Sequence, residues 1–134
     1  MLPFSLTLRS DLPVHDQVIY AVTRAVVGGQ LQACDAFPSV RALSQALKIN
    51  PNTAHRIVAA LVDGGLLAVR PGIGTVVAGG RPASQADKRQ VLDEQAERLV
   101  VAARRSEIAL AELLSAIRRQ WERTAGDDRP GKNR

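Results

Sequence analysis

Apolar residues in the first half of the chain recur at three- and four-residue steps, the spacing of an amphipathic helix. The first such stripe covers residues 14–27 and ends at Gly28-Gly29, where glycine favours helix termination. Its members are Val14, Val18, Ala21, Val22, Ala25 and Val26. We therefore expect a helix over residues 14–27, preceded by a short arm at residues 1–10.

Two shorter stripes follow after a connection at residues 30–38. Ser39 is placed to cap the second helix, whose apolar positions are Val40, Leu43, Ala46 and Leu47. Asn50-Pro51 is a start signal for a third helix, since an acceptor side chain precedes a proline that needs no amide hydrogen. This helix is expected to run to about Val62, before Gly64-Gly65. Only about three residues separate the second helix from the third, which is the arrangement of a helix-turn-helix.

The sequence LLAVRPGIGTVVA, residues 66–78, has two short β-prone runs around Pro71-Gly72-Ile73-Gly74. This pattern predicts a β-hairpin with a glycine-rich tip. Three helices followed by such a hairpin describe a winged helix. The expected fold is therefore mainly α with a small β-hairpin, and residues 1–79 form a winged helix-turn-helix domain.

Residues 80–134 are predicted to be a linker and a helical tail. The chain is expected to be helical from about Ala86 to Thr124. A heptad-like stripe that starts at Leu92, with Trp121 as an anchor at its end, suits packing against a partner helix. Its members are Leu92, Ala96, Leu99, Ala103, Ser106, Leu110, Leu113 and Ile117. The region is either one long helix or two helices with a bend near Arg104-Arg105-Ser106, where Ser106 caps the second. Dimerisation is favoured over packing onto the winged helix, and the residues expected to carry it are Leu92, Leu99, Leu110, Leu113, Ile117 and Trp121.

The third helix carries two opposite faces when it is advanced by about 100° per residue. The apolar face holds Ala54, Ile57, Val58 and Leu61, and the other holds Asn52, His55, Arg56, Ala59 and Asp63. In a helix-turn-helix the second helix enters the DNA major groove, with its N-terminal residues nearest the bases. Asn pairs with adenine, Arg with guanine, and Thr with bases or phosphates. The polar face is therefore either a DNA-reading surface or an ordinary solvated face.

The formal net charge is +5. Residues 1–79 contribute six Lys/Arg less four Asp/Glu, or +2, and residues 80–134 contribute twelve less nine, or +3. A basic balance suits nucleic acid or an anionic membrane surface, and it also serves simple solubility.

Several classes of protein are disfavoured by the sequence. The single Cys34 allows no intrachain disulfide, no signal peptide is recognisable, and no apolar run reaches the about 18 residues of a membrane span. We expect a cytoplasmic protein without membrane contact. His15 and His55 have no metal-ligand spacing, so no metal site is expected. The absence of a nucleophile–base pair, a Walker loop and a dinucleotide fingerprint indicates no enzyme and no cofactor.

The chain resembles the GntR-type bacterial transcription regulators over about residues 11–79. The resemblance is carried by Pro13 and Gln17, Gly29-Gln30-Leu31, the run 38–43 (PSVRAL), the run 50–53 (NPNT), Leu61 with the run 64–67 (GGLL), and the run 70–77 (RPGIGTVV). The NPNT run and the short tail are most similar to the YtrA subfamily, whose members have a brief helical C-terminal region.

This resemblance implies a homodimeric repressor that binds double-stranded DNA at a palindromic operator. The site residues that it implies, together with those inferred from the helix and the hairpin, are Ser39, Arg41, Asn50, Asn52, Thr53, His55, Arg56, Arg70, Gly72 and Gly74. A small-molecule effector is a weaker expectation, and nothing in the sequence names one. The contrasting hypothesis is a winged-helix module that docks other proteins without sequence-specific DNA binding.

The chain departs from the family pattern at three places. Ala33-Cys34-Asp35 stands where Pro-Gly-Asp is usual, which indicates a different turn before the second helix. His15 occupies a position where tyrosine is common, and the usual aromatic after Gln17 is displaced. His55 replaces an arginine or serine, so the preferred operator sequence is expected to be unusual.

Overall fold

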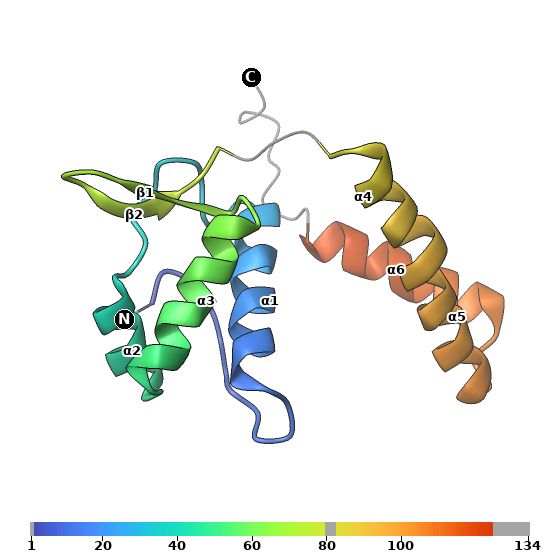
Figure 1. Ribbon diagram of the computed structural model, residues 1–134. Helices are drawn as coiled ribbons and strands as arrows, with labels where there is room; N and C mark the ends of the chain where they lie inside the picture. Colours follow the sequence, from blue (N-terminus) through green and yellow to red (C-terminus); the bar gives the residue numbers. More distant parts are fainter. Residues whose placement is uncertain (1, 80–82, 125–134) are drawn as a thin grey trace. The chain divides into compact units, whose positions relative to one another are not determined.

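The computed structural model describes residues 2–79 and 83–124, which form two compact units on either side of segment 80–82. The first unit holds three helices and a two-stranded hairpin, and the second holds helices alone (Figure 1). This architecture confirms the predicted fold class of a winged helix-turn-helix followed by a helical region.

The first unit is built from α1 (Val14–Val27), α2 (Val40–Leu47) and α3 (Pro51–Asp63). The apolar stripes predicted these helices, and α3 ends one residue beyond the expected end. Their stripes meet in one core, in which Val18, Val22, Leu43 and Ile57 are fully inaccessible to solvent. Burial of such side chains contributes about 1.5–3 kcal/mol each, so the helix stripes are the main source of the unit's stability.

The turn between α2 and α3 is short and is held by three hydrogen bonds within the described residues. Lys48 adopts a left-handed conformation (φ 57°) and its amide donates to the Ser44 carbonyl. The buried Ser44 hydroxyl donates to the Ile49 carbonyl at 2.8 Å, and the Ile49 amide donates back to the Ser44 carbonyl at 3.1 Å. These bonds fix the direction in which α3 leaves α2.

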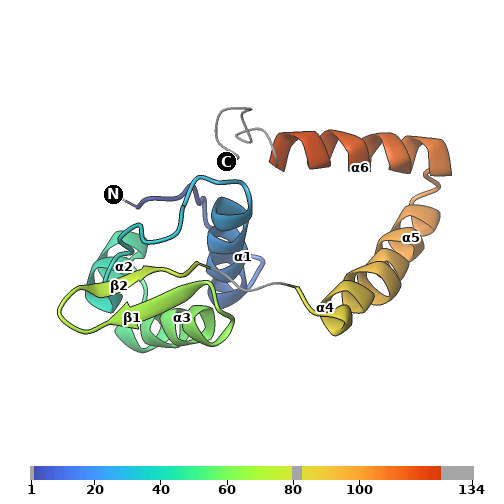
Figure 2. The ribbon, with the colours of Figure 1, turned by 90° about the horizontal axis from the view of Figure 1, so that it is seen from above.

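The wing consists of β1 (Leu67–Arg70) and β2 (Gly74–Val77), paired antiparallel from Leu67↔Val77 to Arg70↔Gly74. A third segment pairs with β2 from the other side, because Ala36 forms a bridge with Val76 and the Phe37 amide donates to the Thr75 carbonyl at 2.9 Å. β1 packs beside α3, and the hairpin lies at the C-terminal end of that helix (Figures 1 and 2). The wing is therefore anchored on both edges.

The segment before α1 was expected to be an arm, but it packs on the core. The Phe4 ring is only 4% exposed and stacks on Phe37, with the ring centroids 5.8 Å apart. Leu2, Leu6 and Leu8 are partly buried against the same core. This packing could not be predicted from the sequence, because these apolar residues lack helical periodicity and their partners lie far along the chain.

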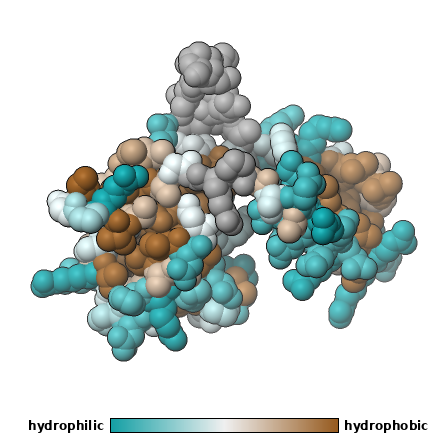
Figure 3. All heavy atoms as spheres, turned by 45° about the horizontal axis from the view of Figure 1, so that its top comes forward, coloured by the Kyte–Doolittle hydropathy of each residue, from teal (hydrophilic) through white to brown (hydrophobic). Residues whose placement is uncertain are grey.

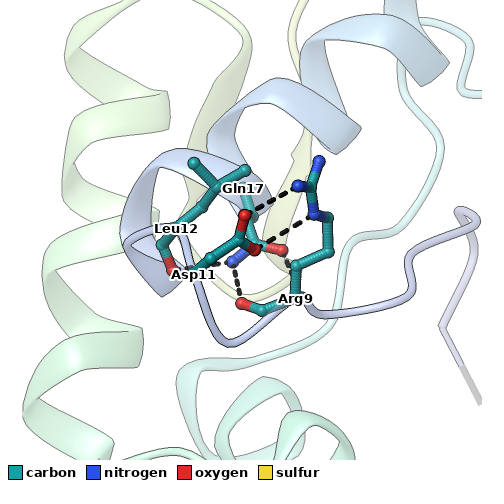
Figure 4. A network of polar contacts seen from close by, with 4 residues as sticks. All are labelled: Arg9, Asp11, Leu12 and Gln17. Atoms are coloured by element: carbon teal, nitrogen blue, oxygen red, sulfur yellow. Dashed lines mark hydrogen bonds and ion pairs between the residues drawn. The ribbon is translucent and has the colours of Figure 1, made fainter.

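The side chain of Gln17, in α1, forms hydrogen bonds with the backbone of the C-terminal end of this segment. Its side-chain oxygen accepts from the Arg9 amide at 2.7 Å, while its amide nitrogen donates to the carbonyls of Arg9 at 2.7 Å and Leu12 at 2.9 Å (Figure 4). Arg9 also forms an ion pair with Asp11 at 2.7 Å. One polar side chain thus sets the turn that leads into α1.

The second unit begins with α4 (Gln85–Arg89), continues through a π-helical turn (Gln90–Gln95) into α5 (Ala96–Arg105), and ends with α6 (Leu110–Thr124). Ser84 and Asp87 form a capping box at its start. The chain bends after Arg105, which settles the open choice in favour of two helical arms rather than one long helix.

The expected role of Ser106 was wrong. Ser106 ends α5, where its amide donates to the carbonyls of Ala102 and Ala103, and α6 begins four residues later at Leu110. Glu107 takes a left-handed conformation (φ 59°), and the Ile108 amide closes the turn on the Ala103 carbonyl. These bonds satisfy the free carbonyls of a helix end, so Ser106 belongs to a C-terminal cap.

The apolar stripe of the tail is largely open to solvent. Leu92, Leu110 and Trp121 are 71%, 68% and 76% exposed, Leu99 and Ile117 are also exposed, and Leu113 is half-buried. Figure 3 shows apolar and polar side chains together on the surface of this unit. Because the bend interrupts the helix, the stripe is divided between two helical arms and is not one continuous heptad run.

Candidate nucleic-acid interface

The two faces of α3 separate in the structure as the sequence predicted. Ala54, Ile57, Val58 and Leu61 are buried. Asn52, His55 and Arg56 are exposed and Thr53 is half-buried. Ala59 and Asp63 continue the exposed face toward the C-terminal end of the helix. The first two turns of α3 therefore present polar side chains that can donate and accept hydrogen bonds.

Two of the predicted DNA-contacting residues also cap helices. The Asn50 side-chain oxygen accepts from the Asn52 amide at 2.7 Å, and the Ser39 hydroxyl oxygen accepts from the Ala42 amide at 3.1 Å. Capping engages only an acceptor, because the Asn50 side-chain amide and the Ser39 hydroxyl keep their hydrogens. Both side chains are exposed, so these donors are accessible to an external acceptor.

Four exposed cations lie on the helix-turn-helix and the wing. Arg41 is in the first turn of α2, Lys48 is in the turn, Arg56 is in α3, and Arg70 ends β1. None of the carboxylates in the structurally described part of the chain forms an ion pair with them, whereas Arg9 is paired with Asp11. Lys48 was not among the predicted contacts, although a lysine between two helices of this kind is a visible signal.

The wing tip is a tight turn that depends on two glycines. The Ile73 amide donates to the Arg70 carbonyl at 3.0 Å, and Gly72 has a φ of 79°, as the third residue of a type II turn requires. Gly74 has a φ of 109°. Apart from each glycine and its two chain neighbours, no heavy atom of the described residues lies within 4 Å of where a Cβ would stand on Gly72 or Gly74. The open space leaves the backbone free to approach a phosphate closely, and Ile73, 74% exposed, projects at the tip.

Cys34 stands where the resemblance expects glycine, and it adopts a left-handed conformation (φ 75°). Its amide donates to the Val77 carbonyl at 2.8 Å, so the turn before α2 keeps its pairing with the wing despite the side chain. The residue is exposed. The altered turn that the sequence indicated is thus a cysteine held in a glycine-like conformation.

Neither a metal centre nor a membrane span appears in the residues that the structure describes. Within residues 2–79 and 83–124, no group of three or more His, Cys, Asp or Glu side chains lies close enough together to hold a metal ion. No helix in these same ranges is both long and apolar enough to cross a bilayer.

An α2–turn–α3 pair with an exposed polar face, unpaired cations and an anchored glycine-tipped wing defines the winged helix-turn-helix class of DNA-binding proteins. Residues 15–77 match the model of the "Bacterial regulatory proteins, gntR family". The winged-helix domain of this chain therefore carries the sequence pattern of the gntR family over residues 15–77, and the chain is a DNA-binding transcriptional regulator.

Relatives with the same short architecture support this assignment. The chain is 26% identical over 106 residues to the HTH-type transcriptional repressor YtrA of Bacillus subtilis (strain 168), covering 78% of this chain and 82% of the relative. It is 31% identical over 88 residues to the uncharacterized HTH-type transcriptional regulator YhcF of the same organism, covering 66% and 63%.

The fold has also been seen in solved structures. A transcriptional antiterminator from Listeria monocytogenes EGD-e matches with a TM-score of 0.78 and 20% identity, covering 91% of this chain and 92% of that one. Similarity at this level of identity shows a shared fold, including the helical region after the wing.

Proposed function

We propose that this protein is a sequence-specific repressor that binds a palindromic operator as a homodimer. The observation that carries the proposal is the outer face of α3, where Asn52, His55 and Arg56 are exposed beside a helix start that favours phosphate. In this reading Asn52 and Arg56 contact base edges, and Thr53 and His55 contact bases or phosphates.

Phosphate contacts are assigned to the remaining predicted residues. Arg41 and Arg70 supply charge from α2 and from the wing, while Ser39 and Asn50 donate from the two helix starts. Gly72 and Gly74 allow the wing backbone to approach the DNA. Such contacts fix the protein's orientation on the duplex but carry no sequence information directly.

The second unit is proposed to supply the dimer interface. It exposes apolar side chains, above all Leu92, Leu110 and Trp121. Burial of this apolar surface by a second copy of the chain would be favourable and would stabilise a dimer. Leu99, Leu113 and Ile117 lie in the same stripe. A two-fold dimer matches a two-fold operator and places two α3 helices on successive turns of the major groove.

Repression, rather than activation, is supported by the name of the YtrA relative. We infer that the protein acts in the cytoplasm and by binding rather than by catalysis, as members of a regulator family do.

The test is fluorescence anisotropy on the DNA upstream of the protein's own gene, with a scrambled duplex and a salt series. Arg56→Ala is expected to cost about 1–3 kcal/mol on the native site and less on the scrambled duplex. Arg89→Ala in α4 removes the same charge from a residue outside the winged-helix domain and is the matched control. Equal losses from Arg56→Ala on both duplexes would show that Arg56 contacts phosphate only.

The same salt series separates the contrasting hypothesis of a protein-docking module. DNA binding through cations releases counterions, so the affinity should fall steeply as salt rises. A weak, salt-insensitive association that ignores DNA sequence would support protein docking instead.

A further inference from the structure

A cleft between the N-terminal segment and α1 is not used by the DNA-binding surface. Its volume is about 580 Å³, within the range of small-molecule sites. The residues from the segment include Leu6, Arg9 and Leu12, and those from α1 include Gln17, Tyr20 and Arg24. Both walls belong to the first unit, and Gln17 holds them together through its three hydrogen bonds.

Three charged residues line this cleft, Arg9, Asp16 and Arg24. The Arg9 guanidinium is engaged by Asp11 at 2.7 Å. The Asp16 carboxylate lies two helical turns before Arg24, and its Oδ1 is 3.6 Å from the His15 Nδ1. Within the described residues no carboxylate forms an ion pair with Arg24, so its guanidinium is free to bind an external anion.

The rest of the lining is suited to an apolar or aromatic body. The Tyr20 ring is 69% exposed although it borders the cleft, and Leu12 is 44% exposed beside it. Ala21 contributes a small side chain, which leaves room next to the helix backbone. An aromatic ring placed there would cover apolar surface that is now open to water.

We propose that this cleft binds a small amphipathic carboxylate. The carboxylate pairs with Arg24, whose planar fork of donors matches it in two parallel hydrogen bonds. The ring or chain of the ligand lies on Tyr20, Leu12 and Leu6. This site goes beyond the DNA-binding function and does not require it, since none of the residues assigned to DNA lines the cleft.

The test uses 4-fluorophenylacetate as a probe, with its neutral amide 4-fluorophenylacetamide as the matched compound. Binding to the full-length protein is followed by broadening of the ¹⁹F resonance. The carboxylate is expected to bind more tightly than the amide. Arg24→Gln is expected to weaken carboxylate binding about fivefold or more, because the charge-assisted hydrogen bonds are lost. Arg98→Gln, an exposed arginine of α5, is the charge-matched control and is expected to bind the probe like the unaltered protein.

Arg24 is exposed on α1, so its substitution is expected to leave the fold intact, which a circular dichroism spectrum checks. The proposal is overturned if the ¹⁹F resonance of the carboxylate does not broaden in the presence of the protein. It is also overturned if Arg24→Gln binds the carboxylate as well as the unaltered protein does, or if the amide binds as tightly as the carboxylate. Because the readout involves no DNA, failure here leaves the DNA-binding proposal untouched, and loss of DNA binding leaves the cleft untouched.

Discussion

Asn50 has a structural role that can be separated from its proposed role at the DNA. Its side-chain oxygen accepts the Asn52 amide at 2.7 Å at the start of α3. Pro51 has no amide hydrogen, and the Ala54 amide already bonds to the Asn50 carbonyl at 3.0 Å. The Asn50 side chain therefore accepts a hydrogen bond from the Asn52 amide, which would otherwise have only water as a partner.

Replacing Asn50 by alanine removes this cap. Loss of an Asn cap costs about 0.5–2 kcal/mol, and the exposed position points to about 1 kcal/mol, because water can replace the lost acceptor. For a unit of this size, that corresponds to a fall of roughly 4–8 °C in melting temperature. Asn50→Asp keeps the acceptor and adds a negative charge at the helix start, where the helix dipole stabilises it. Its melting temperature should match or exceed that of the unaltered protein.

DNA binding should rank the variants differently. Asn50→Asp places a carboxylate where we expect a phosphate, so it should weaken binding more than Asn50→Ala does, although it is the more stable variant. Asn50→Ser, which keeps a cap acceptor, controls for the change in size. Thermal melting by circular dichroism and anisotropy on one duplex provide the two measurements. The reasoning fails if Asn50→Ala melts within about 1 °C of the unaltered protein, or if Asn50→Asp binds DNA undiminished.

Three further predictions concern the packing of each unit. Gln17→Ala should lower the free energy of unfolding by about 1–2 kcal/mol, since three partly exposed hydrogen bonds are lost; urea titration measures it, and an unchanged midpoint would contradict the role of Gln17. Phe4→Ala should lower the free energy of unfolding by about 3 kcal/mol, at the lower end of the range for Phe-to-Ala changes in a core. A loss below about 0.5 kcal/mol in the same titration, which is the range of ordinary surface substitutions, would indicate that the N-terminal segment contributes little to stability. Trp121→Ala should shift the protein toward monomer in sedimentation velocity without changing its helix content; an unchanged dimer fraction would place the interface elsewhere.

The sequence by itself determined the features that depend on neighbouring residues. The three helices of the first unit follow from apolar spacing, and the starts of α2 and α3 follow from Ser39 and Asn50, whose caps the structure shows. The hairpin follows from Gly72 and its neighbours, since a positive φ at that turn position requires a residue such as glycine. These are local effects of backbone geometry, so a pattern within a few residues suffices to predict them.

Contacts between distant residues were decided only by the tertiary structure. Phe4 packs on Phe37, and Ala36 pairs with Val76, because the folded core brings these segments together. The periodicity of apolar residues along the sequence does not predict contacts between such distant segments. The cleft beside α1 is also a tertiary feature, because it lies between α1 and the segment whose Arg9 and Leu12 carbonyls accept hydrogen bonds from Gln17.

The tail shows the same division within one element. Its helical character was visible in the apolar stripe, but the bend after Arg105 was one of two open alternatives. The bend is made by the backbone, through Glu107 in a left-handed conformation and the Ile108 amide on Ala103. Non-glycine residues seldom adopt that conformation, so the sequence favoured a bend in which Ser106 caps the second helix. In the structure the chain instead turns after α5, and the amides of the turn donate to the free carbonyls at the end of that helix.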